Sequence, residues 1–426
     1  MKSRTLVVTA TLVAAAIALT GCSSSGSGKP AASGELTGTV TFWNAYSSDS
    51  PEVKTIDNTI IPAFEKLHPK VTVKDVEIPY DSLHQKLITA VAGDQLPDLL
   101  RSDIIWMPEF ANLGVLAPLD TTLPGFKALA ASTFPGALAT NKWKGHYYGL
   151  PLDTNTRVML YNSDVLAKAG IDSAPATMKD LIADAPKLKA NGVYAYADSG
   201  TGGWGILPFI WSGGGQITDA DNTKATGYMN SKKTVAVVKQ FTDLYQGGYL
   251  PKIIVGDTGG VSTSDGTAKG LYATELDGPW AFPTFASQYP NFKVGTAQVP
   301  AGTGGSISVV GGEDIVLTKS SKNKPAAEAF LKYMLSDSAQ LAMAKVGQMP
   351  VLSSLSSKLT AINSYYEPFT KQLKTSEPRT VTPAWTQIDG ILQDAVRSAM
   401  IGKQTPQAAM DAAAALVDTL LAKYSK

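Results

Sequence analysis

The stretch LTGTVTFWNAYSSDSPEVKTIDNTIIPAFEKLHPKVTVKDVEI, residues 36–78, contains a strand, a helix and a second strand in succession. Residues 36–43 place β-branched side chains in alternation, as half-buried strands do. Apolar residues recur at helical spacing over 56–68, and Pro69 stops this helix because proline cannot donate a backbone hydrogen bond. Residues 71–78 alternate again. This order predicts an α/β fold with a mainly parallel sheet flanked by helices.

The same alternation continues along the chain. A short strand is expected over 98–102, a helix over 178–190 and a strand over 271–277. Thr177 stands at the cap of the second helix, with Asp180 three residues later as a capping-box partner. Ligands of such sheets bind beyond the carboxyl ends of the strands, so the residues that follow each strand are the first candidates for a site.

The N-terminus contains a targeting segment. Cys22, the only cysteine, follows a short positive region and an apolar run over residues 6–19. This pattern is typical of a secretory signal. The Leu-Thr-Gly-Cys sequence at its end resembles the lipobox of bacterial lipoproteins, which implies lipidation of the Cys22 thiol. We therefore expect a lipoprotein signal peptide over residues 1–21, and a lipidated cysteine with a flexible Ser/Gly linker over 22–34.

Composition argues against several functions. Cleavage would remove Lys2 and Arg4 from the 37 basic residues and leave 35 against 36 acidic residues. A chain this close to neutral lacks the positive surface that a nucleic-acid partner needs. A single cysteine allows no disulfide, and the three histidines lack metal-ligand spacing. We therefore expect no metal, no cofactor and no nucleic acid.

Aromatic residues give the strongest indication of function. Most of the seven tryptophans stand beside Gly, Pro, Asn or Asp, where we expect loops and element ends. Sugar rings stack their C–H faces on indoles and offer hydroxyls to planar polar groups. The alternative is a core position for each tryptophan and a helix cap or turn for each polar residue. The tryptophans are Trp43, Trp204, Trp211, Trp280 and Trp385, and the polar residues are Asp81, Asp103, Asp153, Asn155, Asp277 and Glu313.

Short motifs recur in order over residues 37–424. Together they resemble the family 1 extracellular solute-binding proteins, the maltose-binding-like carbohydrate receptors of ABC importers. Each motif is weak alone, but their order and the lipobox make the resemblance specific. The motifs are VTFWN at 40–44, IPYD at 78–81, LPDLLRSD at 96–103 with Trp106, YGLPLDTN at 148–155 with YN at 161–162, DGPW at 277–280, GGE at 311–313 and GKQTP at 402–406.

The resemblance implies two α/β lobes joined by hinge segments, with sugar bound in the cleft between them. Residues 35–150 with 302–356 would form lobe 1, and residues 151–301 with 357–426 would form lobe 2. Trp204 and Trp280 would form a stacking platform. The full set of expected ligand-binding residues is Trp43, Asn44, Tyr80, Asp81, Ser102, Asp103, Trp106, Asp153, Asn155, Trp204, Trp211, Asp277, Trp280, Gly312, Glu313 and Trp385.

We expect a monomeric substrate-binding protein, lipid-anchored at the outer leaflet of the cell membrane. It would close around a sugar such as a maltodextrin-like oligosaccharide and deliver it to the permease of an ABC transporter. One alternative is a receptor for a non-sugar solute. A second is a surface glycosidase, which needs two carboxylates that face each other across a cleft. Glu275 and Asp277 are the available pair, but they lie on one strand face with nothing opposite. We therefore do not expect an enzyme.

Overall fold

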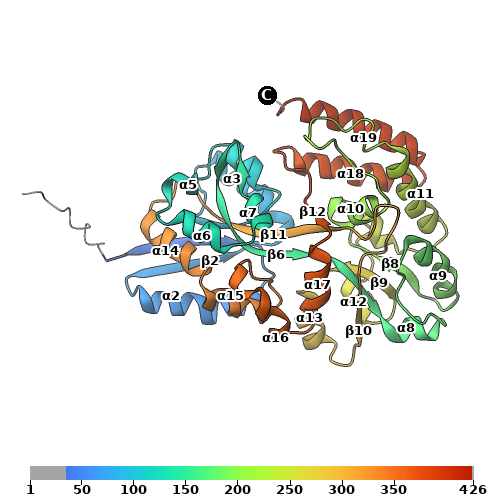
Figure 1. The fold of residues 1–426 in the computed structure, drawn as a ribbon, viewed down its shortest axis with the longest axis horizontal. Helices are drawn as coiled ribbons and strands as arrows, with labels where there is room; N and C mark the ends of the chain where they lie inside the picture. Colours follow the sequence, from blue (N-terminus) through green and yellow to red (C-terminus); the bar gives the residue numbers. More distant parts are fainter. Residues whose placement is uncertain (1–34, 425–426) are drawn as a thin grey trace, which may run out of the picture. The chain divides into compact units, whose positions relative to one another are not determined.

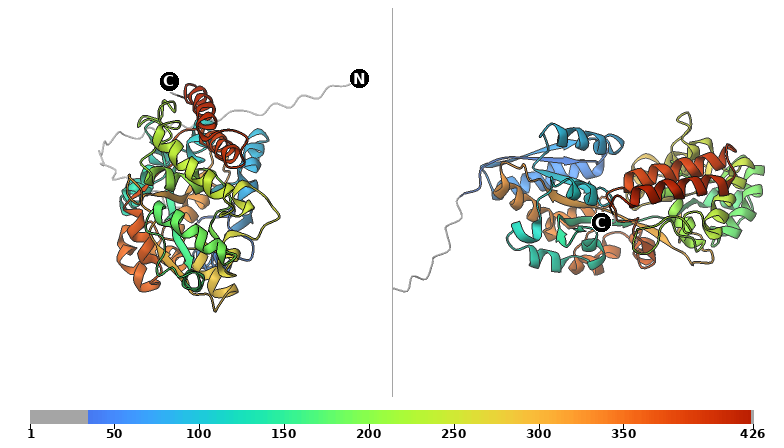
Figure 2. Two further views of the ribbon diagram at one scale, coloured as in Figure 1. Left: turned by 90° about the vertical axis from the view of Figure 1, so that its right-hand side faces the viewer. Right: turned by 90° about the horizontal axis from the view of Figure 1, so that it is seen from above.

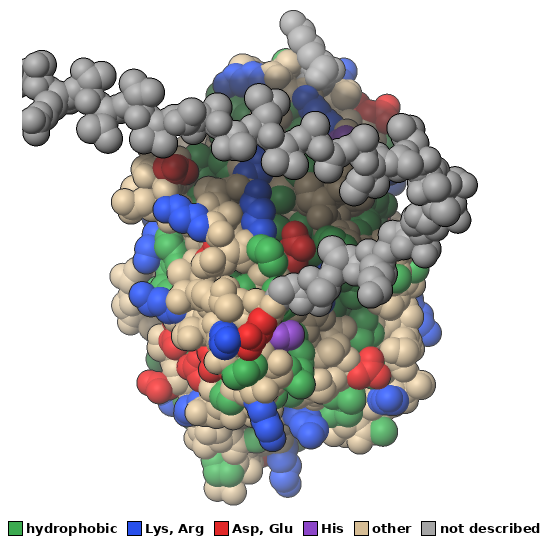
Figure 3. All heavy atoms as spheres, turned by 90° about the vertical axis from the view of Figure 1, so that its left-hand side faces the viewer, with side chains coloured by type: hydrophobic (Ala, Val, Ile, Leu, Met, Phe, Trp, Pro, Cys, Tyr) green, Lys and Arg blue, Asp and Glu red, His purple; other side chains and the backbone are tan. Residues whose placement is uncertain are grey.

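The computed structural model describes residues 35–424. The expected signal peptide, the Cys22 lipid site and the linker to residue 34 lie outside the described residues. Among the described helices, none combines the length and apolar character needed to cross a membrane. Figure 3 shows one face of the molecule, on which positive and negative side chains are interspersed.

The first sheet contains the predicted parallel strands. β1 (Gly38–Asn44) lies between β2 (Val71–Glu77) and β3 (Leu99–Asp103) and is parallel to both. β11 (Ser308–Leu317) continues the sheet antiparallel to β3, and β6 (Gly149–Thr156) pairs antiparallel with β11. Consequently β3, β11 and β6 bring three distant parts of the sequence together.

The second sheet has the order β10-β7-β9-β8. β8 (Tyr194–Ala197) is parallel to β9 (Tyr272–Asp277), whereas β7 (Val158–Asn162) is antiparallel to both β9 and β10 (Val294–Ala297). The α/β class is confirmed: parallel pairs predominate in the first sheet, where β11 also pairs in parallel with β12 (Ser376–Glu377), whereas the second sheet is mainly antiparallel. The chain passes from β6 of the first sheet to β7 of the second through Arg157 alone. Figure 1 shows β6 at the centre of the molecule.

Helix starts follow the capping residues. Thr177 and Asp180 form the predicted reciprocal capping box of α9 (Met178–Ala190). The helix predicted over 56–68 begins earlier, because Ser50 caps it, and it runs as α1 (Pro51–Thr55), a π-helical turn (Ile56–Ile60) and α2 (Ile61–Leu67). The other elements are α3 (Tyr80–Ala92), α4 (Met107–Asn112), α5 (Leu119–Thr122), α6 (Phe126–Ser132), α7 (Pro135–Ala139), β4 (Lys142–Trp143), β5 (His146–Tyr147), α8 (Ser163–Lys168), α10 (Gly203–Ser212), α11 (Lys232–Gln246), α12 (Thr263–Ala268), α13 (Ala281–Gln288), α14 (Lys324–Met334), α15 (Asp337–Ala344), α16 (Leu359–Ile362), α17 (Tyr366–Leu373), β12 (Ser376–Glu377), α18 (Trp385–Met400) and α19 (Pro406–Leu421), with 3-10 turns at Lys252–Val255 and Ser353–Lys358.

Each sheet has its own hydrophobic core. Phe42, Phe64 and Phe330 pack edge to face in the core of the first sheet. Phe209 and Phe241 do the same in the core of the second, where α18 and α19 pack beside α11 (Figures 1 and 2). These cores agree with a two-lobed fold, while the lobe boundaries given above stay a prediction.

Candidate functional site

A cavity of about 570 Å³ lies where elements of both sheets meet, and we call it the cleft cavity. Loops that follow β1 and β3 line it from the first sheet, and α10, α13 and α18 line it from the second. Strands β6 and β11 form its floor. The lining residues are Ala45, Tyr46, Ser47, Ser50, Glu52, Tyr80, Asp81, Arg101, Asp103, Ile105, Asn155, Ser199, Trp204, Trp280, Thr284, Gly311, Gly312, Glu313, Gln348, Arg379 and Asp389.

Two tryptophans form one wall of the cleft cavity. The indole rings of Trp204 and Trp280 are stacked, with centroids 6.4 Å apart and planes 25° from parallel. Trp204 is the one residue of α10 that is not buried, so its ring reaches the cavity from a helix that is otherwise core. The Trp280 ring folds over Gly278, where any Cβ would overlap it. This glycine therefore allows the indole to lie flat against the chain.

Arg101 pairs with the acidic residues at the floor of the cleft cavity. Its guanidinium lies 2.7 Å from the Glu313 carboxylate, 3.4 Å from Asp153 and 3.8 Å from the centre of the Tyr46 ring. The sheet register causes this arrangement, because Glu313 of β11 is opposite Asp153 of β6 and Asp103 of β3. Burial raises the pKa of Glu313 well above its ordinary value, and Arg101 acts in the opposite direction. Arg101 is thus the counter-ion of the buried acids.

Arg379 joins the two sides of the cleft cavity. It follows β12, and its guanidinium lies 3.3 Å from Asp103 of β3 and 5.2 Å from the centre of the Trp204 ring. The same Asp103 accepts the Tyr80 hydroxyl at 2.6 Å and the Ile105 N–H at 2.9 Å. Asp103 therefore accepts three hydrogen bonds from the protein, of the roughly four that a carboxylate can accept.

Arg157 supports the tryptophan wall of the cleft cavity from behind. It pairs with Asp198 at 2.8 Å and donates to the backbone carbonyls of Trp204, at 2.9 Å, and Leu276. Its guanidinium also lies 5.5 Å from the Trp204 ring. These bonds tie α10 to β9, so Trp204 has a fixed position before any ligand arrives.

Two polar side chains in the lining have acceptor atoms that the protein's own hydrogen bonds do not fully satisfy. Asn155 is 6 % exposed, and its Oδ1 accepts no hydrogen bond from the described residues. Asp389 accepts the Gly203 N–H at 2.5 Å, and burial raises the pKa of its carboxyl. Gly311 has no room for a side chain, because a Cβ there would overlap Asn155 and the Trp204 ring. Asp389 thus places an acceptor in the lining, and the unpartnered Asn155 oxygen lies enclosed behind it against Gly311.

The structure brings half of the predicted site residues into the lining: Tyr80, Asp81, Asp103, Asn155, Trp204, Trp280, Gly312 and Glu313. Two more support them from behind. Asp153 holds Arg101, and the Trp106 ring stacks on Tyr80 with centroids 5.3 Å apart. Trp204 and Trp211 lie at the two ends of helix α10, as its second and ninth residues, which agrees with the expectation of loops or element ends; the helix itself was not predicted.

The other predicted residues lie outside the lining, each for a local reason. Trp43 is partly buried, with Lys86 4.9 Å from its ring centre. Asn44 is fully buried and bridges Asp75 to the Tyr46 N–H. The Ser102 hydroxyl donates to a backbone carbonyl, and Asp277 accepts from Ser264. Trp211 and Trp385 are core residues of the second sheet, which is the alternative given for each tryptophan.

Several lining residues were not among the predicted site residues. Arg101 lies two residues before Asp103, on the same face of a strand, and Asp389 lies one helical turn after Trp385. The strand and helix periods could therefore have indicated both residues. Arg379 and Gln348 lie in irregular segments far from the motifs, where the sequence offers no such signal. The residues absent from the prediction are Ala45, Tyr46, Ser47, Ser50, Glu52, Arg101, Ile105, Ser199, Thr284, Gly311, Gln348, Arg379 and Asp389.

An acidic group lies away from the cleft cavity. Carboxylate oxygens of Asp57, Asp75 and Glu77 come within 4.8 Å of one another. Burial raises the pKa of Asp75 to about 7, and Asn44 acts in the opposite direction. No local pattern in the sequence indicates this group, because its members come from a helix and from a strand at the edge of the sheet.

The chain matches the model of the bacterial extracellular solute-binding protein family over residues 47–341. The protein belongs to this family. Its structure is similar to the GacH receptor of Streptomyces glaucescens, solved unliganded and with acarbose: the TM-score is 0.82 and the identity 26 %, over 91 % of this chain and 99 % of that one. Members of the family are extracellular binding proteins, which supports the two-lobed fold and a binding role.

Two further relatives differ in the solute that they are named for. The diacetylchitobiose-binding protein DasA of Streptomyces coelicolor is 25 % identical over 386 residues, which cover 88 % of this chain and 87 % of DasA. The sn-glycerol-3-phosphate-binding periplasmic protein UgpB of Escherichia coli is 26 % identical over 314 residues, covering 66 % and 69 %. These two relatives are thus named for a disaccharide and for a phosphorylated solute.

Proposed function

We propose that this protein captures a saccharide in the cleft cavity and delivers it to an ABC transporter. The observation that carries the proposal is the stacked pair Trp204 and Trp280 beside acceptor groups of Asn155 and Asp389. Indole faces suit the C–H face of a sugar ring, and carboxylate and amide oxygens accept its hydroxyl hydrogens.

The proposed motion is closure of two lobes over the ligand. Residues 35–150 with 302–356, and 151–301 with 357–426, would form these lobes. β6 and β11 run between the two cores and supply Asn155 and Glu313 to the cavity. A saccharide that touches both sides only in the closed form shifts the population toward closure by its differential affinity.

We propose binding without catalysis. A glycosidase needs one carboxyl group as a proton donor and a second as a base or nucleophile. In the cleft cavity, Asp103 is bound by Arg379, Tyr80 and Ile105, and Glu313 is bound by Arg101. These carboxylates are therefore held as counter-ions. Incubation with oligosaccharides should release no shorter sugar, and a time-dependent cleavage product would contradict the proposal.

The binding test is a thermal-shift screen with mono- and oligosaccharides. A ligand at 100 times its dissociation constant stabilises the folded state by about 2.7 kcal/mol, which raises the unfolding temperature measurably. We expect at least one saccharide to do so, including after chelator treatment and dialysis. Failure of every saccharide, with a shift by a non-sugar solute, would favour the alternative receptor function.

We further propose that Cys22 anchors the protein in the outer leaflet of the cell membrane, as a monomer beside its permease. A diacylglyceryl group supplies the two chains that stable anchoring needs. Cys22→Ser should release the protein from the membrane or leave it unprocessed. A Ser variant that stays in the membrane fraction at mature length would contradict the anchor.

A further inference from the structure

The charged residues in the lining of the cleft cavity are predominantly acidic. Five carboxylic acids line it, namely Glu52, Asp81, Asp103, Glu313 and Asp389, against two cations, Arg101 and Arg379. Lysine and histidine do not occur among the lining residues. Low-dielectric walls concentrate the field of such a group, so a solute of like charge is repelled and a positive one is attracted.

Neither arginine is free to serve an anionic ligand. The guanidinium of Arg101 is bound to Glu313 and Asp153 and lies over the Tyr46 ring. That of Arg379 is bound to Asp103. A phosphate or carboxylate that bound either arginine would leave a buried carboxylate without its partner, which is strongly unfavourable. Both arginines are therefore internal counter-ions.

Asp389, like Glu52 and Asp81, forms no ion pair with a described residue, and it lies next to the backbone that carries Trp204. Its Oδ1 accepts the Gly203 N–H, while Arg379, whose charge acts on it, is already bound to Asp103. Burial raises its pKa, which reflects the cost of its negative charge in this place. Asn155 adds an acceptor atom that the described residues leave unpartnered and that lies in a side chain 6 % exposed. Both groups favour a ligand that donates hydrogen.

We infer that the cleft cavity selects saccharides by charge: an amine-bearing saccharide binds more tightly than its neutral counterpart, an anionic saccharide binds least, and Asp389 receives the ammonium group. This inference rests on the proposed function, since it names the saccharides that the same cavity takes. The ammonium group would replace the missing counter-ion of Asp389 beside the indole wall, whose ring faces also attract cations.

The experiment uses sugars that differ in one group. D-glucosamine, D-glucose and D-glucuronate carry an ammonium, a neutral and a carboxylate group on one ring and involve no linkage. The β-1,4 dimer of glucosamine, cellobiose and glucuronosyl-β-1,4-glucose extend the comparison to two rings. Dissociation constants are measured by calorimetry or ligand NMR at about pH 6.5, below the ordinary pKa of an amino group.

We expect the amine to bind about tenfold more tightly than the neutral sugar, equivalent to ~1.4 kcal/mol, with the carboxylate sugar weakest. Asp389→Asn keeps an oxygen for the Gly203 N–H and should remove the preference for the amine. The readout is the ratio of amine to neutral affinity within each variant. Asp394→Asn removes a charge from the same helix at an exposed position outside the lining, and its ratio should equal that of the wild type.

Equal affinities in the wild type, or tightest binding of the carboxylate sugar, would overturn the inference even if the Asn variant fails to fold. An equal loss of the ratio in Asp394→Asn would overturn the role of Asp389. These outcomes are distinct from failure of the proposed function. If no saccharide of any charge binds, the function itself fails, whereas binding of neutral sugars without an amine preference removes only this inference.

Discussion

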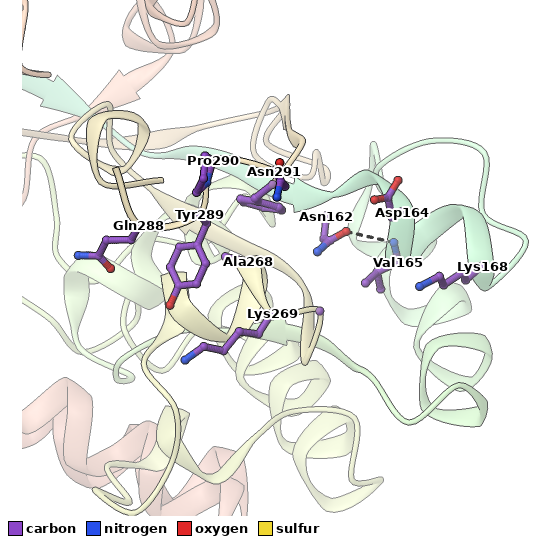
Figure 4. A pocket seen from close by; sticks show the side chains of 12 residues that line it. Asn162, Asp164, Val165, Lys168, Ala268, Lys269, Gln288, Tyr289, Pro290 and Asn291 are labelled. Atoms are coloured by element: carbon purple, nitrogen blue, oxygen red, sulfur yellow. Dashed lines mark hydrogen bonds between the residues drawn. The ribbon is translucent and has the colours of Figure 1, made fainter. Parts of the chain in front are cut away.

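Two hollows of similar size differ in how their polar groups are held. The cleft cavity measures about 570 Å³, and a surface pocket between α8, α12 and the segment after α13 measures about 420 Å³. Figure 4 shows the surface pocket, where Lys168, Lys269 and Gln288 are exposed. In the cleft cavity, Arg101 and Asn155 are each 6 % exposed. Size is therefore a poor guide to a site, and fixed polar groups are a better one.

The largest contrast should appear on removing one cation from each hollow. Arg101→Ala leaves the Glu313 and Asp153 carboxylates buried without their partner, so we expect a loss of about 3–5 kcal/mol in the free energy of unfolding. Lys269→Ala, in the surface pocket, should change it by less than about 0.5 kcal/mol. Urea denaturation measures both, and adding Glu313→Gln should recover part of the loss. Equal effects of the two single changes would show that the floor of the cleft cavity is not held by Arg101.

The next contrast concerns an aromatic residue in each hollow. Trp280→Ala should weaken saccharide binding about tenfold to a hundredfold, at ~1.4 kcal/mol per decade, because one stacking face is lost. Its ligand-free stability should change little, since the ring is partly exposed. Tyr289→Ala in the surface pocket should leave saccharide affinity unchanged.

Trp385→Ala provides the reverse result for a tryptophan in the core, with a loss of about 3–5 kcal/mol in stability. If Trp280→Ala instead lowers stability by this amount and spares affinity, Trp280 belongs to the core and the aromatic wall is misassigned.

A smaller effect is expected from one added methyl group. Gly311→Ala would place a Cβ against Asn155 and the Trp204 ring, and overpacking of this kind costs about 1–3 kcal/mol. Both saccharide affinity and stability should fall. Gly390→Ala, beside Asp389 on α18, has open space around its Cβ and should leave affinity as it is. Unchanged affinity in the Gly311 variant would mean that Asn155 and the Trp204 ring can move enough to accommodate the added methyl group.

The smallest contrast is in pH dependence, and the two regions should differ in sign. Burial raises the pKa of Asp389, so the folded protein holds its proton more strongly than the unfolded chain. This contribution therefore favours folding as the pH falls through that raised pKa toward 3.8. The Tyr289 hydroxyl bound to Asp265, beside the surface pocket, lowers the pKa of that carboxyl. Its stabilisation is present above about 3.8 and is lost below it.

Carboxyl ¹³C NMR should locate the Asp389 titration above the ordinary aspartate value and the Asp265 titration below it. Asp389→Asn should remove the first contribution and leave the second in place. Titration of both residues at the ordinary value would remove this difference between the hollows.

Local signals explain which parts of the structure the sequence predicted well. Thr177 with Asp180 predicted the start of α9, and alternation over 71–78 predicted β2, because caps and strand periods act over a few residues. Helix α10 was not predicted, because Gly203 and Pro208 are poor helix formers and the helix is stabilised by its tertiary packing.

The functional site shows the same difference between residues indicated by local sequence and residues placed by tertiary contacts. Trp204 and Trp280 could be singled out from their neighbours in sequence. The partnership of Arg379 with Asp103 depends on a contact between residues 276 positions apart, which no local pattern encodes. Trp280 and Trp385 likewise have similar glycine- or proline-rich surroundings, and packing alone separates cavity wall from core.

The lining of the cleft cavity begins at Ala45 and ends at Asp389, close to the C-terminus. Its chemistry therefore assembles only when distant parts of the chain meet, since Asp389 binds the Gly203 N–H 186 positions away and Arg379 binds Asp103 276 positions away. A chain cut short before α18 would present indoles and acids without the residues that complete their arrangement. A solute would thus meet the complete lining only in a molecule that has folded through α18.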